Sequence, residues 1–170
     1  MRFRTIIGGG RLVAGNSMIR GGYSCVCFSE APLASLEHGL VNPSVYSRYS
    51  PFGIMFEKSW LFAYGGRPVI YESDAEFDAL PEVLRWRHVR YEPEVIDFTW
   101  EREWRIHCSE LHFTPNEACL VVPSREWSDR LIAQHNADED FKVYQYSQVM
   151  DEFFAQQYRE DFPWRVYLLG

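Results

Sequence analysis

The chain has 170 residues, of which 46% are hydrophobic and 24% are charged. This composition excludes a disordered chain, a collagen and a coiled coil, and the length suits one domain, 1–170, with a conventional core. The formal net charge of −7 argues against a protein that holds duplex nucleic acid by neutralising its phosphates.

Short apolar runs separated by glycine, proline and serine predict a series of short elements. In chain order, the expected strands are 24–28, 52–56, 68–71, 103–108, 118–122, 141–146 and 165–169. The expected helices are 33–40, 58–64, 75–86, 124–135 and 147–160, with a loop at 43–51 and a flexible glycine turn at 8–15. Because strands and helices do not alternate regularly, we expect an α+β fold. Its sheet is mixed or mostly antiparallel and is flanked by short helices.

Some of these elements carry expectations about burial. The run 52–56 is apolar on both faces, which is typical of a central strand buried on two sides. Gly65 and Gly66 are expected to end the preceding helix in a left-handed conformation. Ser124 is a candidate cap for the helix that buries Trp127 and Leu131. In the helix 147–160, three side chains are expected to face inward: Val149, Phe153 and Phe154.

The charge is unevenly placed along the chain. Residues 1–70 have a balance of +4, from seven bases and three acids, and residues 71–170 have a balance of −11, from ten bases and twenty-one acids. The basic part allows a small anionic ligand such as a nucleotide, for which arginine is the better fork. The acidic part suits a basic protein partner.

Targeting and metal signals are missing from the sequence. Residues 1–10 lack the apolar stretch of a signal peptide, and no run approaches the ~20 apolar residues that cross a bilayer. We therefore expect a cytoplasmic protein with reduced thiols and no membrane association. The four cysteines, Cys25, Cys27, Cys108 and Cys119, lack zinc-ligand spacing, so no metal site is expected.

Glu101, Arg102 and Glu103 open the strand 103–108, whose side chains alternate between a polar and an apolar face. Two carboxylates at such a strand end can point into one cleft. A carboxylate there can stabilise an oxocarbenium-like transition state at a sugar carbon. The alternative is that Glu103 and Arg105 form an ion pair on a solvated face, which contributes little to stability.

Ser29 follows the strand 24–28 and lies three residues before Pro32. Its hydroxyl can hydrogen-bond a ligand carbonyl or a ribose. It can equally begin the following helix as a cap, and the two roles are compatible. The chain contains no nucleophile elbow and no phosphate-binding glycine loop.

Aromatic side chains gather around the middle loop. The group comprises Tyr46, Tyr49, Phe52, Trp60, Phe62 and Tyr64. Such residues can stack on a planar ring of a ligand, although they more often form part of a core.

Four segments together carry a resemblance to a known family. They are Cys25–Leu33 (CVCFSEAPL), Tyr49–Trp60 (YSPFGIMFEKSW), Gly66–Tyr71 (GRPVIY) and Trp100–Ile106 (WEREWRI). In this order they resemble the AbiGi-type family of abortive phage-resistance proteins, over roughly residues 19–122. The resemblance implies a phage-defence or toxin–antitoxin setting rather than a particular reaction.

More distantly, the same layout is similar to the ADP-ribosyltransferase fold. That resemblance implies that Ser29 matches the Ser/Thr that supports the nicotinamide ribose of NAD. It also implies that Glu103 is the catalytic glutamate and Glu101 the acid that directs the acceptor. The cofactor-binding residues would be Ser29, Arg4, Arg11, Phe28 and Tyr49.

The chain departs from the transferase pattern at its start. Such transferases carry a His or Arg on the first strand to grip NAD, whereas residues 1–7 resemble the helix that follows that strand. Arg4 or Arg11 would have to substitute. Two functions are favoured: a binding or antitoxin module with an incomplete NAD cleft and a basic partner, and an active NAD-dependent ADP-ribosyltransferase. An unrelated hydrolase or a nucleic-acid-processing role, which these residues do not display, stays open as well.

Overall fold

The structure is a computed structural model that describes residues 2–33 and 50–169. It confirms the α+β class: helices flank several antiparallel and mixed sheets. The α-helices are α1 (Arg2–Gly9), α3 (Lys58–Ala63), α4 (Arg125–Ser147) and α5 (Glu152–Gln156). The 3-10 turns are η1 (Arg20–Gly22), η3 (Phe77–Ala79), η4 (Glu82–Arg87) and η5 (Thr99–Glu101).

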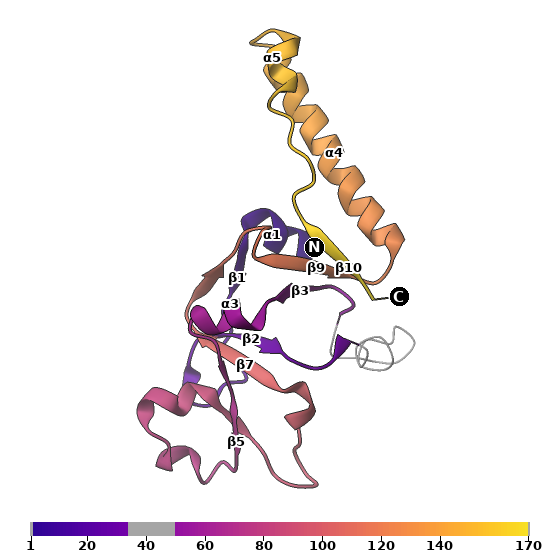
Figure 1. Ribbon diagram of the computed structural model, residues 1–170. Coiled ribbons are helices and arrows are strands. Elements are labelled where there is room, and N and C mark those ends of the chain that lie inside the picture. The colour runs from indigo at the N-terminus through magenta and orange to yellow at the C-terminus, as the bar shows by residue number, and fades with distance from the viewer. Residues whose placement is uncertain (1, 34–49, 170) are drawn as a thin grey trace.

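The strands of the described residues fall into four small sheets. They are β1 (Arg11–Val13), β2 (Cys25–Ser29), β3 (Gly53–Phe56), β4 (Arg67–Pro68), β5 (Ile70–Glu72), β6 (His88–Arg90), β7 (Glu103–His107), β8 (Glu110–His112), β9 (Ala118–Val122) and β10 (Arg165–Leu168). Two sheets have three strands, in the orders β2-β7-β4 and β10-β9-β3, and two are the pairs β1-β8 and β5-β6. Figure 1 shows β2 and β7 below the layer of β3, β9 and β10.

The central strand β7 follows the alternation expected from its sequence. It pairs antiparallel with β2 on one side and with β4 on the other. One face of this sheet contributes Val26 and Ile106 to the core cluster, against which Phe28 and Trp104 pack. The other face carries the polar side chains of Glu103 and Arg105, because successive residues of a strand point to opposite faces.

The second sheet corrects one expectation. The run 52–56 does form a strand, β3, but it lies at the edge of its sheet and its residues are only half-buried. The central strand is β9, where Ala118, Leu120 and Val122 have no exposed surface. Strand β9 pairs antiparallel with β3 and parallel with β10.

The expectations for the glycine-rich stretches of the first half of the chain are confirmed only in part. Residues 2–9 form helix α1, so Gly8 and Gly9 are helical and only Gly10, at φ +56°, makes the expected turn. Helix α3 ends at Ala63, and the left-handed conformation expected just after it is found at Gly65, with φ +89°, but not at Gly66. The expected helix 33–40, the loop 43–51 up to residue 49, and the aromatics Tyr46 and Tyr49 lie outside the described residues.

The helix expected at 75–86 is wrong. Two short 3-10 turns, η3 and η4, occupy this stretch and are separated by Leu80 and Pro81. Leu80 is extended, at φ −66° and ψ 137°, because the proline ring disfavours a helical conformation in the residue before it.

The largest difference lies near the C-terminus. Helix α4 begins after Ser124 as expected, but the Ser124 side chain makes no capping hydrogen bond, and Trp127 and Leu131 are only half-buried. The helix continues to Ser147, so the strand expected at 141–146 is helical. The helix expected at 147–160 shrinks to α5 (Glu152–Gln156). Its three supposedly inward residues are exposed: Val149 by 80%, Phe153 by 69% and Phe154 by 57%. Together α4, α5 and the return segment 157–164 form an arm that rises from the rest of the molecule (Figure 1).

Within residues 2–33 and 50–169, no helix combines the length and the apolar character that a membrane crossing requires.

Candidate functional site

The pairing of β2 with β7 brings two of the expected site residues together. In this antiparallel register Ser29 is the direct partner of Glu103, and Cys27 is the partner of Arg105. The alternation of each strand places all four side chains on the face opposite the hydrophobic core. Ser29 and Glu103 thus lie side by side although they are 74 positions apart in the sequence.

A cavity of about 460 Å³ opens on this face. Its lining residues come from the segment 18–20, from the ends of β2 and β7, and from the stretch 74–101. The polar ones are Arg20, Ser29, Asp74, His88, Arg90, Glu101, Glu103 and Arg105. We call this space the polar cavity. Its volume lies within the range typical of small-ligand sites.

The carboxylate of Glu103 is bound by Arg105 at both oxygens. Arg105 Nε donates to Glu103 Oε1 at 2.8 Å and Arg105 Nη2 to Oε2 at 3.3 Å. The side chains are only 13% and 5% exposed. Arg105 Nη1 also donates to the carbonyls of Trp86 and His88, at 3.0 and 2.9 Å. The ion pair anticipated between Glu103 and Arg105 exists, but it is buried rather than solvated.

Ser29 uses its hydroxyl to join two turns of the chain. Its Oγ donates to the carbonyl of Glu101 at 2.7 Å and accepts from the backbone N–H of Ala31 at 3.1 Å. The N–H of Glu30 donates to the same Glu101 carbonyl, at 3.1 Å. The bond from Ala31 closes a local turn, because Ala31 is not helical. Residues 34–40 of the helix that Ser29 was expected to begin lie outside the described residues. Any contact of Ser29 with a ligand has to share this hydroxyl.

The remaining sequence-predicted residues are only partly assembled. Glu101 and Phe28 line the polar cavity together with Ser29 and Glu103. Arg4 lies exposed in α1, and Arg11 in β1 forms an ion pair with Glu110 at 3.2 Å. Neither arginine is among the residues that line the polar cavity. Tyr49 lies outside the described residues.

Two arginines that the sequence analysis did not single out line the cavity instead. Arg20 Nη1 lies 2.9 Å from Asp74 Oδ1 and also donates to the Asp74 carbonyl. Arg90 Nε lies 3.7 Å from Asp74 Oδ2 and pairs more closely with Glu92. Arg20 precedes Ser29 by nine positions and Arg90 precedes Glu103 by thirteen, but neither arginine belongs to a recognisable motif. Their place beside the polar cavity is known only from the folded structure.

The cysteine on the cavity face has an unreactive thiol. Cys27 is an exposed residue, yet desolvation of its thiol by the surrounding atoms raises the pKa to about 12, and the nearby Glu103 carboxylate adds to the rise. A pKa this high keeps the thiol protonated at neutral pH, which disfavours its action as a nucleophile.

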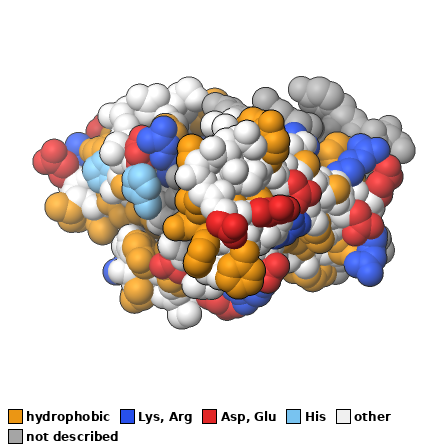
Figure 2. Space-filling model, turned by 90° about the horizontal axis from the view of Figure 1, so that it is seen from above, with side chains coloured by type: hydrophobic (Ala, Val, Ile, Leu, Met, Phe, Trp, Pro, Cys, Tyr) orange, Lys and Arg blue, Asp and Glu red, His pale blue; other side chains and the backbone are white. Residues whose placement is uncertain are grey.

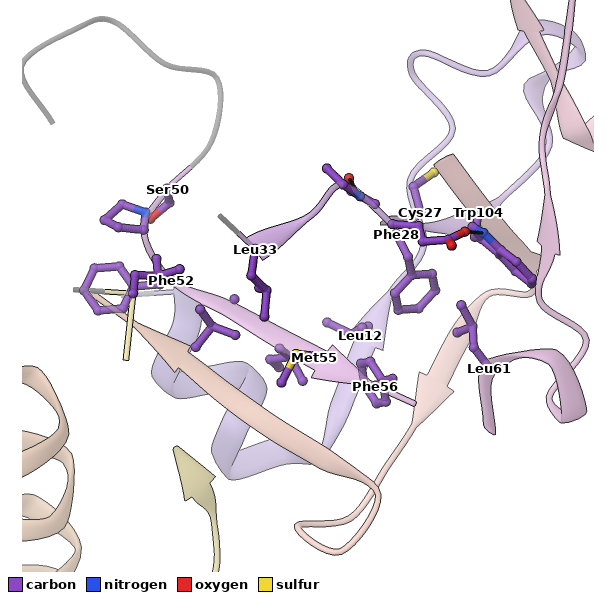
Figure 3. Close-up of a pocket in the computed structure, with 18 of the residues that line it drawn as sticks. Leu12, Cys27, Phe28, Leu33, Ser50, Phe52, Met55, Phe56, Leu61 and Trp104 are labelled. Carbon is purple, nitrogen blue, oxygen red and sulfur yellow. Dashed lines mark hydrogen bonds between the residues drawn. The ribbon is translucent and has the colours of Figure 1, made fainter. Parts of the chain in front are cut away.

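A second, apolar cavity of about 590 Å³ lies on the other side of β2. Phe28, Leu33, Ser50, Met55, Phe56 and Leu61 are among the residues that line it, and the side chain of Leu33 points toward Met55 (Figure 3). The two cavities share the last three residues of β2, which therefore form the wall between them.

Glu30, just beyond this wall, is held by three donors. Its carboxylate accepts from Lys58 Nζ at 2.6 Å, Trp104 Nε1 at 2.8 Å and Arg102 Nη2 at 2.9 Å. The hydrogen bond from Lys58, followed by that from Trp104, lowers the pKa of this carboxyl. Glu30 lies inside the segment Cys25–Leu33 that carries the family resemblance, but no local pattern marks it as a functional residue, and its role follows only from these contacts.

Nothing in the described part of the chain groups three or more His, Cys, Asp or Glu side chains closely enough to hold a metal ion. Comparisons with protein-family models, with curated proteins and with solved structures found no match.

Proposed function

We propose that this protein is a binding module of a phage-defence or toxin–antitoxin system, with an ADP-ribosyltransferase-like layout and a cleft that does not transfer ADP-ribose. The setting rests on the four-segment resemblance to the AbiGi-type family. The binding role rests on the chemistry of the polar cavity and on the acidity of residues 71–170.

One observation supports above the others a cleft that does not transfer ADP-ribose: both oxygens of Glu103 accept hydrogen bonds from the buried Arg105. A ribosyl transition state needs an anion whose charge is directed at the developing cation. A guanidinium 2.8 Å from that carboxylate opposes such a cation with its own positive charge. The pair suits a structural role, because Arg105 also holds the carbonyls of Trp86 and His88.

The acidic part of the chain supports a basic protein partner. Residues 71–170 have a balance of −11, and complementary charge speeds association and selects partners. The proposal therefore pairs a nucleotide-sized cavity with a protein-docking surface elsewhere on the chain.

A second candidate function is an active NAD-dependent ADP-ribosyltransferase. It is favoured by the direct pairing of Ser29 with Glu103 beside one cavity. In that reaction the bond between the ribose C1′ and nicotinamide breaks, and nicotinamide leaves with the electron pair. The acceptor forms the new bond to C1′ and loses a proton. Glu103 would stabilise the ribosyl cation and Glu101 would orient the acceptor.

The fit of the chain to NAD is partial. Arg20 and Arg90 offer guanidinium groups of the kind that bind a pyrophosphate, but Asp74 contacts both of them. NAD, if bound, would supply the ribosyl group. The chain's own contribution would be to bind its phosphates and to exclude water from the cavity.

Nicotinamide release by the purified full chain separates the two functions. The test uses NAD, basic acceptor proteins, the wild type, Glu103→Gln, and Glu57→Gln as a control. Glu57 is exposed and lines neither cavity. The binding module predicts no release above the protein-free background. Release that is lost only in Glu103→Gln would overturn it in favour of the transferase.

The partner is tested separately by co-purification from the native host at low and high salt. We expect a basic protein to be retained at low salt and lost at high salt, because mobile ions screen exposed charges. Recovery of the chain alone at both salt concentrations would overturn the docking role.

A further inference from the structure

The arm presents side chains that the rest of the described chain does not cover. It leaves the second sheet after β9, reaches its far end between α4 and α5, and returns to β10 (Figure 1). The end of the arm carries Val149, Asp151, Glu152, Phe153 and Phe154, all of them exposed. We call these five residues the arm tip.

The arm is packed along its inner seam. Val143 of α4 is 7% exposed and Ala155 of α5 is fully buried, and the rings of Tyr146 and Tyr158 meet edge to face at 4.9 Å. Helices α4 and α5 are in contact. The exposed residues of the arm tip therefore lie on an ordered element and not on a frayed end.

Polar bonds fix the return segment against α4. Glu139 Oε2 accepts from the N–H of Glu160 at 2.8 Å, and His135 Nε2 lies 3.0 Å from the Glu160 carbonyl. Arg159 pairs with Asp140. These contacts hold the return segment in a fixed position along α4.

The arm tip exposes more apolar surface than an isolated hydrophobic residue would. Val149, Phe153 and Phe154 are exposed by 80%, 69% and 57% within six positions of sequence. The two phenylalanine rings contact each other, with centroids 5.6 Å apart. Clustered exposed aromatics of this kind mark interaction surfaces, whereas single ones are ordinary.

The charge beside these rings is negative. Residues 138–160 contain six acids and two bases, and both bases are paired within the arm, Lys142 with Glu139 and Arg159 with Asp140. At the arm tip, Asp151 and Glu152 directly precede the two phenylalanines. Figure 2, which looks down on the arm, shows hydrophobic and acidic side chains next to each other on the face toward the viewer.

We propose that the arm tip docks on a basic protein partner, with Phe153 and Phe154 in an apolar pocket and with Lys or Arg side chains facing Asp151 and Glu152. This inference rests on the proposed function and names its docking surface. Charge selects the occupant. A second copy of the chain would bring the same acids together, whereas a basic surface complements them.

The probe is a synthetic amphipathic helical peptide with leucines on one face and lysines on the other, compared with its glutamate counterpart. Binding to the full chain is measured by fluorescence anisotropy. We expect saturable binding of the lysine peptide only. Phe153→Ser/Phe154→Ser should weaken it about tenfold or more, since buried aromatic anchors dominate interfaces. Asp151→Asn/Glu152→Gln should weaken it about fivefold at low salt and reduce its salt dependence.

The matched control is Phe141→Ser/Tyr144→Ser. These aromatics are each 60% exposed and lie on α4, outside the five residues of the arm tip, so the variant should bind as the wild type does. Because all substituted side chains are exposed, circular dichroism spectra should stay unchanged. Asn at position 151 keeps an oxygen for the bond that Asp151 Oδ1 accepts from the N–H of Phe153.

Three results would overturn the inference: no saturable binding of the lysine peptide, equal binding of both peptides, or unchanged binding by the Phe153/Phe154 variant. A wild-type dimer in sedimentation that this variant dissolves would assign the arm tip to a second copy instead. If the host partner still co-purifies with the Phe153→Ser/Phe154→Ser variant, the protein does bind a basic partner, but the arm tip is not its docking surface. If the peptide binds but no host partner is recovered, the proposed function fails alone.

Discussion

Ser29 and Glu103 are direct partners across β2 and β7, yet each side chain is bonded to a different neighbour. The hydroxyl of Ser29 donates to the carbonyl of Glu101, and the carboxylate of Glu103 accepts from Arg105. The same few residues therefore form both the strand pairing that favours a transferase and the hydrogen bonds that favour a cleft without transferase activity. Measurements on these bonds decide between the two.

Arg105→Lys should destabilise the protein by about 2–4 kcal/mol. Arg105 serves both oxygens of Glu103 and two backbone carbonyls from a buried position, and a lysine ammonium cannot span that arrangement. Urea denaturation of the full chain measures the change.

The control for this substitution is Arg102→Lys. Arg102 is 57% exposed and pairs with Glu30, so its exchange should cost less than about 1 kcal/mol. Similar denaturation midpoints for the two variants would contradict a structural role for the buried pair.

Cys27 should resist alkylation in the folded protein. With its thiol pKa raised to about 12, the thiolate population at pH 8 is roughly a thousandfold below that of an ordinary cysteine. The rate of iodoacetamide labelling is measured at a series of pH values by mass spectrometry of the Cys27 peptide. It should keep rising with pH, without a plateau, up to the highest pH at which the protein stays folded. Labelling in denaturant supplies the reference. A folded-state midpoint near the ordinary value of about 8.5 would contradict the enclosure of this thiol.

Acid should weaken the contribution of Glu30 to stability. Its folded-state pKa is lowered, mainly by Lys58 and then by Trp104. The stabilisation is therefore complete above the unfolded-state pKa, about 4.3, and is lost as the pH falls through the lower folded value. The difference in free energy of unfolding between the wild type and Glu30→Gln should shrink from neutral pH to strongly acidic pH. A difference that stays constant over this range would contradict the prediction.

Gly66→Ala should destabilise the protein, by about 2 kcal/mol or more. A Cβ at this position would lie 2.6 Å from the backbone carbonyl oxygen of Leu61, to which the N–H of Gly66 donates at 2.8 Å. Thermal denaturation measures the loss. Gly8→Ala is the matched control, because a Cβ there meets nothing within 4 Å. In helix α1 it should raise stability by up to about 1 kcal/mol. Equal effects of the two substitutions would contradict the close approach at Gly66.

Local sequence patterns predicted the strands of the cavity well. The alternation at 103–108 places Glu103 and Arg105 on one face, and β7 has that arrangement. No local sequence pattern predicts that the backbone at Trp86 and His88 lies over this face and helps to bury Arg105. That burial depends on the long-range packing of η4 and β6 against β7, which no local pattern reports.

The arm was misread for a different reason. Phe141, Val143, Tyr144 and Tyr146 favour strands by propensity, but they continue a helix that already runs from Arg125. Only Val143 is buried among them, so this part of α4 lacks the apolar stripe by which helices are recognised. In the 75–86 stretch, by contrast, Pro81 was a visible signal against a continuous helix.

Strands β9 and β10 are parallel neighbours, so residues 123–164 are an excursion that departs from one sheet and returns to it. Parallel neighbours always need a crossover, and here α4 alone extends it by about 35 Å at 1.5 Å per residue. Lengthening, shortening or exchanging this excursion would leave the floor of the polar cavity intact. The arm and the polar cavity therefore draw on separate stretches of the sequence, and a change in one leaves the residues of the other in place.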